Sequence, residues 1–148
     1  MGTTIGYALT EFNRLHKKMN VIYHDYAKSV DLSDAAFWLM YSLHEHNRPR
    51  TQRDLCEEWC YASQTINSAL KILEEKGFIA LLPTPENRKN KQVCLTESGE
   101  KLVREKVVPL IRAEERSFER MDERERESML ETTRKHIAIL AEEINKTK

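Results

Sequence analysis

The order of patterns between Thr51 and Leu95 limits the fold of this chain more than any other feature of its sequence. Two helical patterns lie on either side of the short segment "CYA", and two β-rich runs, "FIALL" and "KQVCL", follow them. In the second helical pattern, apolar residues recur at Ile66, Leu70 and Leu73, the spacing of one helix face. The two runs are separated by "PTPENRKN", a turn-rich and net basic segment, which predicts a β-hairpin with a long loop.

Start and stop signals set the bounds of these helices. Thr51 followed by Asp54 resembles a capping box, and Gly77 stands where helices commonly end. An earlier segment, "DAAFWLMYSLHEH", is apolar almost all round and predicts a central, buried helix capped by Ser33. After the hairpin, Thr96 can cap a further helix. Helix, helix, turn, helix and hairpin together predict a winged helix-turn-helix, a mainly α fold with a small β-hairpin wing.

Long amphipathic helices are predicted on both sides of this core. The segment 5–26 has apolar residues at helical spacing, and so does the last helix, which starts near Asp122 and reaches Ile144. A helix that follows the hairpin is predicted to run to about Met121, with a bend at Pro109. The fold class is therefore a winged helix-turn-helix core with helices at both ends.

The apolar stripes of the terminal helices have no third layer to pack against within one chain. A second subunit is the simplest cover for them. We therefore predict one domain, 1–148, with a winged helix-turn-helix DNA-binding core at 33–96. The segments 1–30 and 97–148 are predicted to be dimerisation helices, and the protein partner is a second copy of this chain.

The composition excludes several classes of protein. No segment approaches the about 18 apolar residues that a membrane-spanning helix needs, and the start of the chain lacks the apolar core of a signal peptide. Three cysteines without a disulfide-framework spacing indicate reduced thiols, so we predict a cytoplasmic protein with no membrane partner. No Gly-rich phosphate loop, nucleophile elbow or paired carboxylates indicate an enzyme, and no cofactor is predicted.

The polar face of the helix at 63–77 begins with short, uncharged groups, whereas most of this chain is rich in Glu, Lys and Arg. On an isolated helix such a face would more often be plain solvated surface. In a helix-turn-helix, however, the second helix presents its N-terminal residues to base edges in the major groove, where amides and hydroxyls match donors and acceptors. The residues of this helix predicted to contact DNA are Ser63, Gln64, Thr65, Asn67, Ser68 and Lys71.

Basic residues surround this helix, although the chain as a whole has 24 basic and 24 acidic residues and is neutral. A basic wing tip can reach the neighbouring minor groove, whose negative potential attracts Arg. The wing residues predicted to contact DNA are Arg88, Lys89 and Lys91. The residues predicted to contact phosphates at the start of the preceding helix are Arg48, Arg50, Thr51, Gln52 and Arg53.

The stretch from Thr51 to Leu102 resembles the core of the multiple-antibiotic-resistance-repressor (MarR) family. The matching features are the run "LEEKGFI", a wing with an acidic-x-Arg tip, and the restart "LTESGE". The flanking helices agree too, so the resemblance covers nearly the whole chain. Two positions depart from the family pattern. Glu86 replaces the usual Asp at the wing tip, and Ala62 stands where Ser or Thr usually starts the recognition helix, so Ser63 is expected to cap one residue later.

The resemblance implies a homodimeric, sequence-specific DNA-binding transcriptional regulator. Each subunit would set one recognition helix into a major groove of an inverted repeat in double-stranded DNA, with Arg88 at the wing tip and the terminal helices forming the dimer interface. It also implies a repressor that responds to a small aromatic or phenolic effector. The residues at the family's usual effector cleft are His16, Tyr23, Tyr26, Trp38 and Tyr41, although aromatic residues at helical spacing are more often plain core.

Two other interpretations stay open. A helical adaptor that keeps this fold but has lost DNA binding would fit the neutral total charge. A redox-sensing regulator would use Cys56, Cys60 or Cys94, of which the first two are four residues apart and are expected to share a helix face. Small half-buried hydrophobes are the favoured interpretation of these thiols. No metal is predicted, because neither the cysteines nor the histidines have the spacing of a ligand set.

Overall fold

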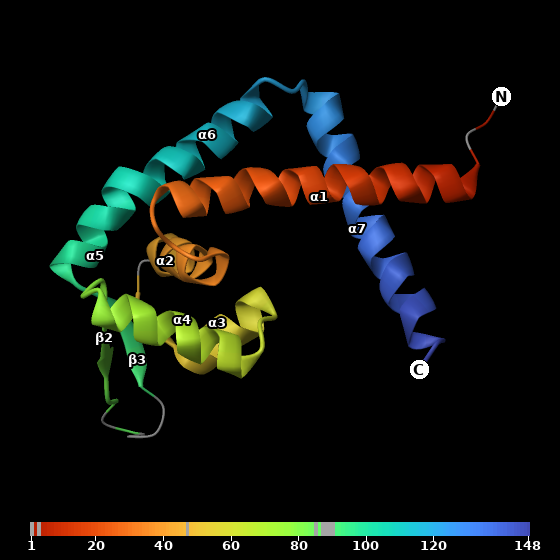
Figure 1. Ribbon diagram of the computed structural model, residues 1–148. Helices are drawn as coiled ribbons and strands as arrows, with labels where there is room; N and C mark the ends of the chain where they lie inside the picture. The colour runs from red at the N-terminus through yellow and green to blue at the C-terminus, as the bar shows by residue number, and fades with distance from the viewer. Residues whose placement is uncertain (1, 3, 47, 85, 87–90) are drawn as a thin grey trace. The chain divides into compact units, whose positions relative to one another are not determined.

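The computed structural model describes the chain except for residues 1, 3, 47, 85 and 87–90. It is mainly helical with one small sheet, as predicted (Figure 1). The chain divides into two compact units, Met1–Val108 and Pro109–Lys148. Its elements are α1 (Ile5–Ser29), α2 (Asp34–His46), β1 (Arg50–Thr51), α3 (Gln52–Trp59), α4 (Ser63–Glu75), β2 (Ile79–Leu82), β3 (Gln92–Leu95), α5 (Glu97–Leu102), the π-helix η1 (Val103–Val107), α6 (Val108–Glu119) and α7 (Glu123–Asn145).

Helix α2 is the centre of the first unit. Its side chains Phe37, Leu39 and Met40 are at most 1% exposed. The helix packs against α1, α4 and η1, so its apolar residues are covered on several sides. Ser33 caps it by accepting a hydrogen bond of 3.2 Å from the Ala36 N–H. The prediction of a central, buried helix with this cap is confirmed.

Helix α3 has the predicted capping box at its start. The Thr51 hydroxyl accepts from the Asp54 N–H at 3.1 Å, and the Asp54 carboxylate accepts from the Thr51 N–H at 3.0 Å. The helix buries Leu55 completely and ends at Trp59. Cys60 then turns the chain with a left-handed φ of 54°. Since Cys60 lies outside the helix, the expectation that it shares a helix face with Cys56 is wrong.

Helix α4 begins after Ala62, whose extended backbone ends the turn and which makes no side-chain cap. The expectation that Ser63 caps this helix is therefore wrong, because Ser63 is already its first helical residue. At the other end Gly77 adopts a φ of 79°, a conformation that glycine accepts without strain. The Phe78 N–H donates to the Leu73 carbonyl at 3.0 Å, which completes a glycine-terminated cap of the predicted kind.

The wing is a three-stranded antiparallel sheet in the order β1–β3–β2. Strand β3 pairs with β2, and it also pairs with β1 through Arg50↔Val93 and Thr51↔Gln92. The sequence predicted the hairpin of β2 and β3 but not β1, because two residues are too few to show an alternating pattern. Strand β1 joins the wing directly to the start of α3.

The helical segment after the wing is less regular than predicted. Thr96 caps α5, as expected, by accepting from the Gly99 N–H at 3.0 Å. A π-helical turn, η1, follows, in which the Val108 N–H donates to the Val103 carbonyl five residues back. Pro109 has no N–H to continue the normal ladder, so the irregularity falls in the turn before the proline rather than at it.

Close packing fixes the start of α5 against the end of the helix-turn-helix. The Thr96 hydroxyl donates to the Gly77 carbonyl at 2.6 Å, and the Thr96 N–H donates to the Phe78 carbonyl at 3.1 Å. A Cβ added to Gly99 would lie 1.9 Å from the Phe78 carbonyl oxygen. Only glycine therefore allows this approach without a shift of the backbone.

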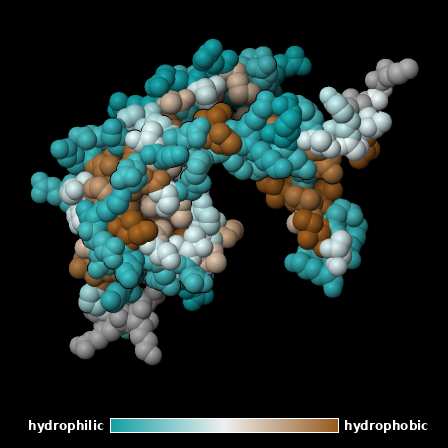
Figure 2. Space-filling view, viewed as in Figure 1, coloured by the Kyte–Doolittle hydropathy of each residue, from teal (hydrophilic) through white to brown (hydrophobic). Residues whose placement is uncertain are grey.

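The second unit consists of most of α6 together with α7, which starts with a capping box between Asp122 and Glu125. No residue of α7 is buried, and Ile137, Leu140 and Ile144 are 61%, 46% and 47% exposed. Hydrophobic side chains gather along the visible face of this helix (Figure 2). Over the described residues, no helix is both long and apolar enough to cross a membrane.

Candidate nucleic-acid interface

Helix α4 has two contrasting faces. Its inner face is formed by Ile66, Leu70 and Leu73, which are at most 2% exposed. Its outer face is polar and exposed to solvent, as the sequence predicted. The exposed residues of this face, called here the polar row, are Ser63, Gln64, Thr65, Asn67, Ser68 and Lys71. Burial of the inner face fixes the rotation of the helix and so holds the polar row outward.

Members of the polar row differ in how much of their hydrogen-bonding capacity is already used. The Ser68 hydroxyl donates to the Gln64 carbonyl at 3.0 Å, so only its acceptor capacity points elsewhere. The Asn67 side-chain oxygen accepts from the side-chain amide of Gln52. Gln64, Thr65 and Lys71 make no side-chain hydrogen bond with any described part of the chain. These three are the most available to a ligand.

Arg50 does not have the position expected of a phosphate contact. Its side chain is only 9% exposed, and its guanidinium lies 3.0 Å from a Glu58 oxygen and 3.8 Å from an Asp54 oxygen. A buried cation already paired with two carboxylates is not available to a phosphate. The expectation for Arg50 is therefore corrected to a structural role, in which it joins β1 to α3.

Glu58 is the half-buried centre of this network, and no pattern in the sequence indicates it. Its carboxylate accepts from the Ser42 hydroxyl at 2.8 Å and lies 3.1 Å from the His46 ring. Burial acts to raise the pKa of Glu58, but these hydrogen bonds and the charge of Arg50 hold that pKa below its usual value. No helical spacing in the sequence indicates this pairing, because Arg50 lies in strand β1 and Glu58 near the end of α3.

The other residues predicted at the start of α3 have different environments. Arg48 is exposed, and the Arg53 side chain is 79% exposed with an ion pair of 2.9 Å to Glu57. An exposed pair of this kind is weak and can exchange for a phosphate. Thr51 uses its hydroxyl in the capping box, and Gln52 is half-buried against Asn67.

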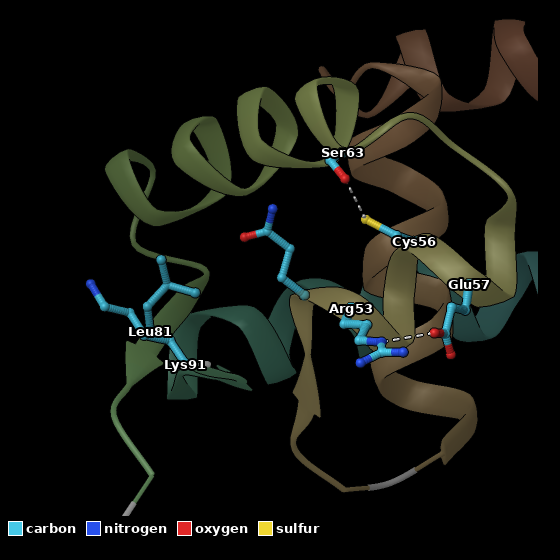
Figure 3. Close-up of a pocket in the computed structure, with 7 residues that line it drawn as sticks. Arg53, Cys56, Glu57, Ser63, Leu81 and Lys91 are labelled. Carbon is cyan, nitrogen blue, oxygen red and sulfur yellow. Dashed lines mark hydrogen bonds and ion pairs between the residues drawn. The ribbon is translucent and has the colours of Figure 1, made fainter. Parts of the chain in front are cut away.

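A cavity of ≈ 390 Å³ separates the two helices of the motif from the wing (Figure 3). It combines basic groups with the thiol of Cys56, whose sulfur lies 4.0 Å from the Ser63 hydroxyl. Lys91 contributes an exposed ammonium from the wing, whereas the predicted wing residues Arg88 and Lys89 lie outside the described residues. The lining residues are Gln52, Arg53, Cys56, Glu57, Ser63, Leu81 and Lys91.

A sequence profile of the MarR family matches residues 30–89, which span α2, the helix-turn-helix and the first part of the wing. This segment, about two fifths of the chain, is similar to the MarR family, whose members are DNA-binding transcriptional regulators and not enzymes. No match was found among curated protein sequences.

Solved structures agree on the fold. The S. aureus MepR–DNA complex is 22% identical, with a TM-score of 0.74 over 94% of this chain and 99% of that chain. A MarR family regulator from Neisseria meningitidis is 19% identical, with a TM-score of 0.74 over 93% of this chain and 99% of that chain. BldR from Sulfolobus solfataricus is 20% identical, with a TM-score of 0.68 and the same two coverages. The predicted MarR-type winged helix-turn-helix fold is confirmed.

Most of the aromatic residues predicted to line an effector pocket pack on one another. The Trp38 ring lies 5.1 Å from Tyr23, 5.3 Å from Tyr41 and 5.1 Å from Trp59, a residue that the prediction did not include. Such distances are typical of aromatic rings packed in a core. The effector pocket stays a prediction.

Two further members of the predicted pocket have other neighbours. The Tyr26 hydroxyl donates to the Lys106 carbonyl at 2.6 Å, and burial raises the pKa of this phenol. His16 is exposed and stacks on Phe12, with the ring centres 6.3 Å apart. Tyr26 therefore ties α1 to η1 within the first unit.

The cysteines and the other potential metal ligands have separate environments. Cys56 and Cys94 are half-buried and Cys60 is exposed. Among the described residues, Glu45, His46 and Glu58 have potential ligand atoms within 4.8 Å of one another. The Glu58 carboxylate of this group is already engaged by Ser42 and Arg50. The absence of a metal stays a prediction.

Proposed function

We propose that this chain is a homodimeric repressor that reads an inverted repeat of double-stranded DNA through α4 and is released by a small aromatic ligand. The observation that carries the proposal is the polar row, an exposed and mostly uncharged set of amides and hydroxyls at the start of the second helix of a winged helix-turn-helix. Base edges in the major groove require such groups.

The residues of the interface have separate roles in this proposal. Gln64, Thr65 and Asn67 address base edges, because they stand in the first turns of α4. Lys71 and Lys91 contact the phosphate backbone, together with the exposed Arg48 and Arg53. Arg88 and Lys89 are proposed as further DNA contacts from the sequence alone. Arg50 has no place in this interface.

The dimer is supported by apolar surface that the chain leaves uncovered. On α1, Leu9, Leu15 and Met19 are 51–56% exposed, and α7 exposes its stripe of Ile137 and Leu140. Such surface on two long helices is more than scattered apolar residues explain. A second copy covers it by an isologous contact and also supplies the second recognition helix that an inverted repeat needs.

The ligand response would act on the balance between two states of the dimer. A ligand that binds more tightly to a state unable to span both half-sites would shift the population toward that state. The aromatic cluster around Trp38 joins α1, α2 and α3, so a ring inserted there would alter how the helix-turn-helix sits on α1. Cytoplasmic localisation likewise stays a prediction.

Relatives lend support of a general kind. S. aureus MepR has been crystallised as a complex with DNA and, separately, in a DNA-binding conformation. This chain has the same fold as MepR, with TM-scores of 0.74–0.75, although only 22% of the residues are identical. A shared fold makes the docking of α4 geometrically feasible, and the polar row supplies the chemistry.

The proposal is tested by DNA selection followed by titration of the selected duplex over a range of salt concentrations. Lys91→Ala should weaken binding and reduce the slope of log K against log salt by about one unit, because one phosphate contact is lost. Lys28→Ala removes the same charge from α1 and should leave the slope unchanged. No binding of any duplex at low salt would favour the adaptor interpretation and overturn the proposal.

A further inference from the structure

One hydrogen bond joins the polar row to the rest of the helix-turn-helix. The Gln52 side-chain amide nitrogen donates to the side-chain oxygen of Asn67. Gln52 is half-buried and is the first helical residue of α3, whereas Asn67 is exposed in the second turn of α4. The bond therefore links a framework residue to a residue of the outer face.

Gln52 is held from both sides by backbone structure. The residue before it, Thr51, pairs with Gln92 in the sheet and forms the capping box with Asp54. Its side chain also contributes to the walls of two cavities, one of ≈ 390 Å³ at the start of α4 and one of ≈ 410 Å³ along the later turns of that helix. The backbone that carries the Gln52 side chain is therefore held by the sheet on one side and by the capping box on the other.

The hydrogen bond limits which groups Asn67 can offer, because it occupies one of the two acceptor positions of the side-chain oxygen. A free Asn side chain offers an oxygen acceptor and an NH₂ donor, and together these match adenine in bidentate fashion. With its oxygen engaged by Gln52, Asn67 presents chiefly its two N–H donors. Donors fit guanine N7 and O6 or thymine O4, whereas cytosine offers only a donor in the major groove.

We propose that Gln52 is a specificity-determining positioning residue, which holds Asn67 as a hydrogen-bond donor and so directs it toward guanine or thymine and against cytosine. This inference rests on the proposed function, because it needs α4 to lie in the major groove. It assigns to Gln52 an indirect role in reading bases, in place of the direct phosphate contact that the sequence suggested.

The test compares base preferences of three variants on the selected duplex and on all substitutions of it. Asn67→Ala identifies the base pair that Asn67 reads. Gln52→Met keeps the length of the side chain but removes the donor, and discrimination against cytosine should fall about five- to tenfold at that same base pair. Gln52→Glu should accept from the Asn67 NH₂ and turn the oxygen outward, so that the preference shifts toward cytosine or adenine.

Two controls separate specificity from stability and charge. Gln92→Met makes the same chemical change at a half-buried position of the wing and should leave the profile unchanged. The negative charge of Gln52→Glu weakens binding to every sequence alike, so its effect is read from ratios between sequences. In the Asn67→Ala background, Gln52→Met should change no base preference at all.

The outcomes are distinct. Relaxed preference at the Asn67 base pair with Gln52→Met, and reversal with Gln52→Glu, would support the inference. A uniform loss of affinity, or an effect at a different base pair, would overturn it while leaving the proposed function intact. Wild-type protein that binds no DNA would overturn both.

Discussion

The helix-turn-helix core and the terminal helices α1 and α7 have the same apolar periodicity but very different burial. In the core, Leu39, Leu55 and Leu73 are 0% exposed. On the terminal helices, Ile22 is 68% exposed and Ile137 is 61% exposed. An apolar helical stripe therefore predicts which residues pack against another surface, but not whether that surface belongs to the same chain. We attribute the difference to a second subunit.

The largest effect is expected from a charge placed on the apolar stripe of α7. Ile137→Glu would bury an unpaired carboxylate in the proposed dimer interface, which costs several kcal/mol. The dissociation constant of the dimer should therefore rise by at least about 100-fold. Sedimentation equilibrium should give a species near 17.4 kDa for the variant and twice that mass for the wild type. Ser128→Glu adds the same charge to the opposite, exposed face of the same helix and should stay dimeric.

If Ile137→Glu leaves the dimer unchanged, α7 does not form part of the interface. A wild-type protein that sediments as a monomer would remove the dimer altogether and, with it, our explanation of the contrast between the two regions.

The next largest effect is expected inside the core. Leu73→Ala should lower the free energy of unfolding by about 2–5 kcal/mol, because the residue is fully buried and its removal leaves a cavity. Ile72→Ala is the matched control, because the Ile72 side chain is 44% exposed on the same helix. It should lower the free energy of unfolding by about 0.5 kcal/mol. Urea unfolding at one fixed protein concentration measures both. Equal losses would show that the rotation of α4 is not as described.

A smaller effect is expected from the buried network around Arg50. Glu58→Gln should lower the free energy of unfolding by about 1–3 kcal/mol at neutral pH, because the Arg50 guanidinium loses its nearest counter-charge. Glu57→Gln breaks an exposed pair with Arg53 on the same helix and should cost less than about 1 kcal/mol. Thermal unfolding compares the two variants directly.

The same network sets a pH dependence. The pKa of Glu58 is lower in the folded chain than in the unfolded chain, so the unfolded chain binds the proton more tightly. The stabilisation is present above the ordinary carboxyl pKa, about 4.3, and is lost as the pH falls through the folded pKa. Glu58→Gln should therefore flatten the acid side of the stability profile. A variant as sensitive to acid as the wild type would contradict this assignment.

The sequence predicted the fold and the exposed chemistry better than it predicted contacts between residues that are distant along the chain. The caps at Thr51, Gly77 and Thr96 and the outward polar row follow from short-range patterns, and these agree with the structure. Strand β1 was missed because its pairing with β3 joins residues about 40 positions apart. No local pattern of two residues carries that information.

The candidate site shows the same limit. A row of arginines before a recognition helix indicates phosphate contacts, but whether each cation is free depends on tertiary neighbours. Arg50 is neutralised by Glu58, and Gln52 is engaged by Asn67 across two helices. Charge spacing along one helix indicates neither pairing, because Arg50 lies in strand β1, and Gln52 and Asn67 lie on different helices.

The central claim is that two copies of the polar row read bases on a two-fold site. The most direct measurement is the base-substitution profile of the selected duplex with wild type and with Gln64→Ala, using Glu75→Ala at the far end of α4 as control. The account predicts that Gln64→Ala abolishes about 1–3 kcal/mol of discrimination at two symmetry-related base pairs about one helical turn apart, and that Glu75→Ala does not. An unchanged profile, or a change at a single unpaired position, would contradict it.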